Sequence, residues 1–156
     1  MESHTLTSER AKLEQQHHQG ASWFFWIAGL SLVNSLIILT GNEWSFIIGL
    51  GITQIIDAVA VGLSADLGNA ATFVALFLDL LVAAAFVGLG ILARRGIQAI
   101  YLIGMVVYAL DGALFLLVQD WLSIGFHAFA LFCIFAGFKA NRQLAELEEQ
   151  AVPSVA

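Results

Sequence analysis

Cysteine, proline and positive charge are all scarce in this chain of 156 residues. The single cysteine, Cys133, lies inside an apolar run, so the sequence has neither a disulfide framework nor a CxxC metal pattern. The single proline, Pro153, lies near the C-terminus, so no proline interrupts an apolar segment. With six lysine and arginine residues in all and no basic patch, the chain lacks the electrostatic footprint of a nucleic-acid-binding protein.

Apolar residues are correspondingly abundant. Hydrophobic residues make up 60% of the chain and charged residues 12%, and the mean hydropathy of +0.87 is well above that of an ordinary soluble domain. A hydrocarbon core about 30 Å thick requires roughly 20 apolar residues per helical crossing. Runs of about that length lie at residues 22 to 40, 44 to 63, 71 to 93, 97 to 118 and 121 to 138. We therefore predict an all-α, polytopic membrane helix bundle with five hydrophobic helices.

Short polar breaks separate these runs, so consecutive helices are predicted to pack as hairpins. The breaks are Gly41-Asn42-Glu43, Ser64 to Asn69, Arg94-Arg95-Gly96 and Gln119-Asp120. The chain divides into a polar N-terminal tail at residues 1–20, a transmembrane bundle at 21–138 and a cytoplasmic C-terminal helix extension and tail at 139–156. The first run has no cleavage pattern after it, so the first helix is expected to stay in the membrane.

Two topologies are compatible with the positive-inside rule. If all five runs span, an outside N-terminus puts Arg94, Arg95, Lys139 and Arg142 in the cytoplasm and leaves the other two cations outside. If the run at 44 to 63 is interfacial or re-entrant, four crossings put both termini and all six cations inside. The length of the run favours five crossings, whereas the distribution of charge favours four. Both topologies place the C-terminus in the cytoplasm.

Polar side chains inside apolar helices are costly in hydrocarbon, so they usually face the bundle interior and indicate functional positions. Helical spacing predicts three inward-facing stripes that carry ionisable residues, each with small or aromatic neighbours. They are Tyr101, Gly104, Tyr108 and Asp111; Ser123, His127 and Ala130; and Ala75, Asp79 and Ala83.

No lysine or arginine lies within the apolar runs to neutralise the intramembrane carboxyl groups. Each must therefore be protonated, hydrogen-bonded, paired with His127 or occupied by a cation. The functional hypothesis is a proton or small-cation site in the outer half of the membrane, formed by Asp57, Asp79, Asp111 and His127, with surrounding hydrogen-bonding groups from Asn34, Gln54 and Tyr108. The alternative is that these groups hold helices together in a non-catalytic membrane subunit or scaffold.

Enzymatic and cofactor functions have weaker support. Within the apolar runs, no two metal ligands recur at helical spacing, so the sequence neither predicts nor excludes a metal site. A haem would need a second intramembrane histidine besides His127. His17 and His18 lie in the tail and are expected to be solvated. Ser31, Ser35 or Ser64 with His127 would suit an intramembrane hydrolase, but residues 62 to 66 read GLSAD and lack the GxSxG turn. No cofactor and no enzymatic activity are predicted.

The expected partners are the lipid bilayer and other copies or subunits. Tryptophans at the ends of the runs are interpreted as interfacial anchors; they are Trp23, Trp26, Trp44 and Trp121. Ala58 with Gly62 and Ala84 with Gly88 are candidate small-residue helix contacts. A chain with so few helices is small for alternating access, so a homo-oligomer or a larger membrane complex is expected. The predicted location is a bacterial cytoplasmic (inner) membrane.

Overall fold

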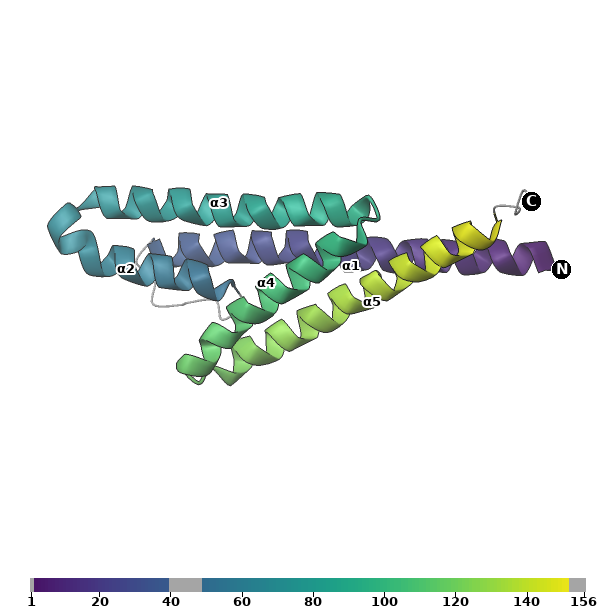
Figure 1. Ribbon diagram of the computed structural model, residues 1–156. Coiled ribbons are helices and arrows are strands. Elements are labelled where there is room, and N and C mark those ends of the chain that lie inside the picture. Colours follow the sequence, from purple (N-terminus) through teal and green to yellow (C-terminus); the bar gives the residue numbers. More distant parts are fainter. Residues whose placement is uncertain (1, 40–48, 152–156) are drawn as a thin grey trace.

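The computed structural model describes residues 2–39 and 49–151 and contains five helices there (Figure 1). They are α1 (Glu2–Leu39), α2 (Gly51–Leu67), α3 (Asn69–Arg94), α4 (Gln98–Leu117) and α5 (Trp121–Ala151). These described ranges contain no strand, which confirms the all-α prediction. The predicted break at residues 41–43, Trp44 and the start of the run at 44 to 63 lie outside the described residues.

The outer segments of the chain are helical extensions of the first and last helices. α1 continues without interruption from the polar N-terminal segment into the apolar run, and α5 continues past Phe138 to Ala151. The two extensions lie side by side (Figure 1), where Arg10 Nη2 is 3.1 Å from Glu148 Oε1. Because both side chains are exposed, this ion pair contributes little to stability.

Local chemistry explains where the helices begin and end. Gly68 and Gly96 adopt positive φ angles of 56° and 81°, which suit glycine, at the ends of α2 and α3. The carboxylate of Asp120 caps α5, since its Oδ1 accepts hydrogen bonds from the backbone N–H groups of Leu122 and Ser123. The hydrogen bond that the Ser123 hydroxyl donates to Oδ2 lowers the pKa of Asp120.

Four of the five helices are long and apolar enough to cross a membrane: Thr7–Ile38 within α1, Asn69–Arg94, Gln98–Leu117 and Trp121–Gln150 within α5. α2 has 17 residues and runs in the same direction as α1 (Figure 1). Contacts confirm this direction, because Ser31 hydrogen-bonds to Thr53 at 2.8 Å and Ser35 interacts with Asp57. The shared direction of α1 and α2 and the four candidate spans favour the four-crossing alternative over the five crossings that the length of the run favoured.

The beginning of α1 and the end of α5 lie at one end of the bundle, which we call the terminal end (Figure 1). The α3–α4 turn with Arg94 and Arg95 lies at this end too, so all six cations of the chain belong to the terminal end. The α2–α3 and α4–α5 turns lie at the opposite end, which we call the hairpin end.

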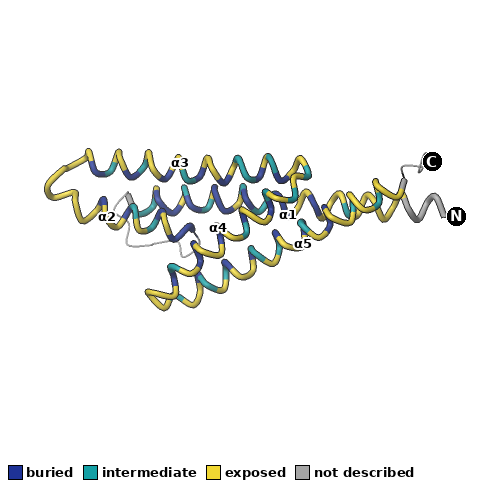
Figure 2. The backbone as a smooth tube through the Cα atoms, viewed as in Figure 1, coloured by how far each residue is buried: buried dark blue, intermediate teal, exposed yellow. Residues whose placement is uncertain are grey.

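Burial follows narrow stripes on the inner faces of the helices, while most of the outward surface is exposed (Figure 2). The centre of the bundle is aromatic: Phe24 packs against Phe86 and Tyr101, and Phe86 packs edge-on against Tyr108. The outward surface is apolar, as helices surrounded by lipid require.

α1 and α5 approach each other closely where they cross at Gly20 and Gly137. A Cβ atom added to Gly20 would lie 2.4 Å from the Cα of Gly137, so two glycines are needed at this crossing. The small-residue pairs predicted from sequence form no close helix contact within the described part of this chain. Ala58, Gly62 and Ala84 are exposed, and Cβ atoms added at Gly62 or Gly88 would have no neighbour within 4 Å.

Candidate functional site

The three predicted polar stripes are buried. Asp79 is fully excluded from solvent, and Asp111 and His127 are exposed by 7% and 3%. The small and aromatic residues that share their stripes are buried too. The carboxyl groups and the imidazole therefore face other helices and not the surrounding lipid, as their helical spacing predicts.

Asp111 on α4 binds the beginning of α2. Its Oδ2 accepts a hydrogen bond from the backbone N–H of Gly51 at 2.8 Å, and its Oδ1 accepts one from the N–H of Ile52 at 2.9 Å. α2 has no side-chain cap of its own, so Asp111 supplies the acceptors that a local cap would otherwise provide. A carboxylate is also favoured there by the partial positive charge at a helix N-terminus.

His127 on α5 completes this contact, and both of its ring nitrogens are occupied. Nε2 lies 3.0 Å from Oδ2 of Asp111, and Nδ1 lies 2.8 Å from the backbone oxygen of Ser123. Because a carbonyl oxygen accepts and never donates, Nδ1 carries a hydrogen. One further proton must lie between Nε2 and Asp111 Oδ2, since two lone pairs facing each other would repel. His127 thus has no free lone pair with which to act as a general base.

Rings hold the imidazole in place. Tyr108 stacks on it with a centroid separation of 4.3 Å and an interplanar angle of 18°, and the Phe115 ring lies 5.1 Å away. A Cβ atom added to Gly112 would lie 2.9 Å from the imidazole, so the glycine makes room for it. We call Asp111, His127 and the first turn of α2 the α2 anchor. Its contacts account for every polar atom of the two side chains.

The other two predicted carboxyl groups, Asp57 on α2 and Asp79 on α3, form a separate pair. Both are fully buried, and none of their oxygens has a partner in hydrogen-bonding geometry among the described residues. The two groups interact with each other and with the hydroxyl of Ser35 on α1. Asn34 is also fully buried without a hydrogen-bond partner in the described ranges. We call Asp57, Asp79 and Ser35 the carboxyl pair site.

The four predicted site residues therefore divide between two places along α2. Asp111 meets α2 at Gly51, whereas Asp57 lies about 9 Å further along the helix axis at 1.5 Å per residue. Of the three predicted surrounding residues, Tyr108 stacks on His127 in the α2 anchor, whereas the buried side chain of Asn34 lies beside Gly49. Gln54 is only partly buried, and among the described residues its side chain forms no hydrogen bond with either place.

The serine and histidine residues proposed for hydrolysis are not brought together. Ser31 hydrogen-bonds to Thr53, the exposed Ser64 donates to the Val61 carbonyl, and both nitrogens of His127 are engaged elsewhere. Within the described ranges, no group of three or more His, Cys, Asp and Glu side chains is arranged to hold a metal ion.

Sequence reasoning missed a polar contact at the terminal end. His17 was expected to be solvated but is buried, and the Tyr101 hydroxyl donates to its backbone oxygen at 2.9 Å. Arg94 donates to Ser22 Oγ at 2.8 Å and lies 4.6 Å from the centroid of the Phe25 ring. The sequence contained a signal for this burial. His17 lies three, four and seven residues before the buried Gly20, Ala21 and Phe24, so it lies on the same side of α1 as they do.

No family model, curated protein or solved structure matches this chain.

Proposed function

We propose that this protein binds a proton, or a small cation in its place, at the carboxyl pair site. The observation that carries the proposal is the complete burial of Asp57 and Asp79 next to each other, where only the Ser35 hydroxyl and the other carboxyl group interact with them and no ion pair to either is present among the described residues. Two neighbouring carboxylates cannot both remain ionised in an apolar interior, so a shared proton or a bound cation must offset their charge. Carboxylate and hydroxyl oxygens are also among the ligands that hard cations prefer.

Reaction with a hydrophobic carbodiimide tests this proposal, because the reagent modifies protonated carboxyl groups in apolar surroundings. We expect mass spectrometry to find the adduct on Asp57 or Asp79, and labelling to decrease as the pH rises and the shared proton is lost. If a cation replaces the proton, sodium or lithium chloride will lower labelling more than choline chloride at equal ionic strength. Asp57→Asn and Asp79→Asn should each strongly reduce labelling of the remaining carboxyl group, because each removes one of the two groups that share the proton.

Asp66→Asn is the matched control, since Asp66 is an exposed carboxyl group on the same helix as Asp57. Its labelling pattern should equal that of the unmodified chain. The proposal would be refuted if neither Asp57 nor Asp79 formed an adduct at any pH. It would also be refuted if the extent of labelling there changed neither with pH nor with the added cation.

The competing function is that of a non-catalytic membrane subunit, in a homo-oligomer or a larger complex. The α2 anchor favours this function, because every polar side-chain atom of Asp111 and His127 is engaged in a hydrogen bond within the bundle. The carbodiimide experiment separates the two functions. A purely structural carboxyl pair would have no proton or cation in exchange with the solvent.

We further infer that the terminal end faces the cytoplasm, since it holds all six cations of the chain and positive flanks favour that side. In a Cys133→Ala background, Ser64→Cys should react with a membrane-impermeant thiol reagent added outside intact bacterial cells. Ala145→Cys, at an exposed position of the α5 extension, should react only after the membrane is permeabilised. The reverse pattern would invert the orientation.

A further inference from the structure

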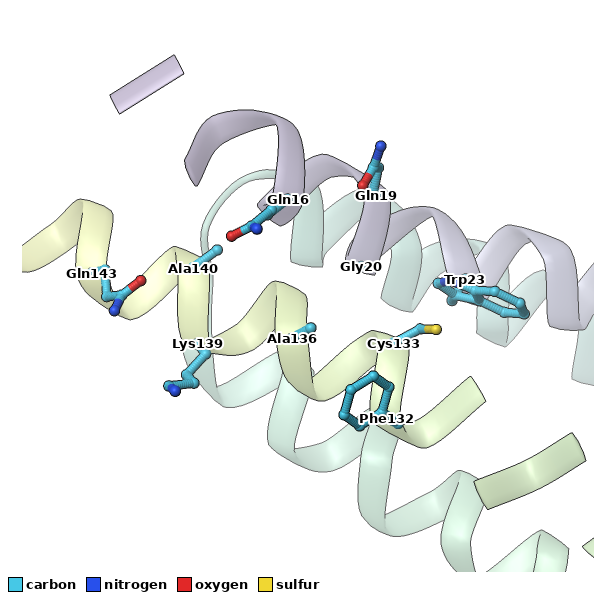
Figure 3. Close-up of a pocket in the computed structure, with 10 residues that line it drawn as sticks. All are labelled: Gln16, Gln19, Gly20, Trp23, Phe132, Cys133, Ala136, Lys139, Ala140 and Gln143. Atoms are coloured by element: carbon cyan, nitrogen blue, oxygen red, sulfur yellow. The ribbon is translucent and has the colours of Figure 1, made fainter. Parts of the chain in front are cut away.

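A groove of about 360 Å³ lies between α1 and α5 on the terminal side of the bundle (Figure 3). One part of its lining is polar and consists of Gln16, Gln19, Lys139 and Gln143. The other part is apolar and includes Trp23, Phe132, Cys133 and Ala136. Figure 3 shows these side chains on the two helices that border the groove, with Gln16, Ala136 and Ala140 between the helices.

The groove lies where the chain passes from polar to apolar sequence on both helices. On α1 the change occurs between Gln19 and Ala21, and on α5 it occurs between Phe138 and Lys139. The contact between Gly20 and Gly137 places these two transitions at the same level. In a membrane, this level corresponds to the boundary between headgroups and acyl chains.

The charge of the groove is positive. No ion pair involving Lys139 is present in the part of the chain that the structure describes. The acidic side chains Glu14 and Glu146 of the same two helices are paired with arginines on their own helices. Lys139 is thus available to an anion, and the glutamine amides beside it can donate hydrogen bonds.

The apolar part of the groove is pre-shaped by aromatic packing. The Trp23 ring packs edge-on against Phe129 with a centroid separation of 5.3 Å, which holds the indole in position on the groove wall. The small side chains of Cys133 and Ala136 leave room between Trp23 and Phe132. A chain of methylene groups fits such a surface, whereas a free phosphate ion would leave it uncovered.

We propose that this groove binds an anionic phospholipid, with its phosphate at Lys139 and the first part of an acyl chain against Trp23 and Phe132. The site is independent of the carboxyl pair site, which lies on other residues. An anionic headgroup matches the unpaired lysine, and the change from polar to apolar lining matches the order of groups in a phospholipid.

Cys133 provides the readout, since it is the single cysteine of the chain and lines the groove. The full-length protein is placed in nanodiscs of phosphatidylcholine alone or with phosphatidylglycerol, and the rate of alkylation by a maleimide is measured. Phosphatidylglycerol is expected to slow alkylation about five-fold, the factor that one lysine contributes near an anionic surface. Glycerol 3-phosphate, which has no acyl chain, should leave the rate unchanged.

Lys139→Gln removes the charge and is expected to abolish the difference between the two lipids. Arg142→Gln is the matched control, because Arg142 is an exposed cation on the same helix that does not line the groove. It should keep the full difference. Equal rates in both lipids, or an equal loss of protection in both variants, would overturn the proposal. Protection that depends on protein concentration and not on headgroup would assign the groove to a second copy of this chain.

Discussion

Replacing Gly20 with leucine is expected to destabilise the bundle by about 3 kcal/mol, at the upper end of the usual cost of overpacking a well-packed contact. The nearest atoms to an added Cβ belong to the Gly137 backbone, at 2.4 Å from Cα and 2.8 Å from N. Backbone cannot rotate away as a flexible side chain can, so α1 and α5 would have to separate. Reversible unfolding in mixed micelles, followed by circular dichroism, measures the change in free energy.

Gly29→Leu is the matched control on the same helix. A Cβ atom added at Gly29 would meet nothing within 4 Å, so leucine there points into open space. The substitution should be neutral or stabilising by up to about 1 kcal/mol, since leucine is a better helix former than glycine. Opposite signs for the two substitutions would show that the crossing requires glycine. If Gly20→Leu and Gly29→Leu have equal effects, the helices do not cross at Gly20.

Asp111→Leu is expected to destabilise the protein by about 3 to 5 kcal/mol, the usual cost of removing one member of a buried pair. It would leave the N–H groups of Gly51 and Ile52 without their acceptor and would leave Nε2 of His127 without its partner. The loss should concentrate in α2, which has no side-chain cap of its own. Hydrogen exchange measured by mass spectrometry should therefore speed up more in the first turn of α2 than in α3.

Asp66→Leu is the control for this substitution, since it removes an exposed carboxyl group near the other end of α2. Its stability and its exchange pattern should stay close to those of the unmodified chain. Unchanged exchange at Gly51 and Ile52 in Asp111→Leu would mean that Asp111 does not hold the beginning of α2. A uniform acceleration in all helices would instead indicate general unfolding without a local anchor.

The α2 anchor and the carboxyl pair site differ in how many hydrogen bonds the structure provides to their carboxyl groups. Asp111 has two backbone donors and an imidazole partner, whereas Asp57 and Asp79 have no partner in hydrogen-bonding geometry among the described residues. A buried polar group that the fold leaves unsatisfied is a stronger indication of a ligand than one whose contacts are complete. The carboxyl pair site is therefore the better candidate for binding a proton or cation.

The sequence by itself determined the fold class and which side of each helix faces inward. Apolar length and composition required membrane-compatible helices, and helical spacing placed Asp79, Asp111 and His127 on buried stripes. These properties could be predicted because they depend on residues within one turn or two of each other.

Only the tertiary structure decided the direction of α2 and the glycine contact between α1 and α5. It also decided that the four predicted site residues divide between the α2 anchor and the carboxyl pair site. Helical spacing gives the angular position of a residue on its own helix but does not say which helix lies opposite or at what height. Gly20 and Gly137 are in contact although most of the chain separates them in sequence. Asp111 on α4 likewise accepts a hydrogen bond from Gly51 at the beginning of α2. Contacts between segments so distant in sequence arise from the packing of all the helices together, so no local pattern specifies them.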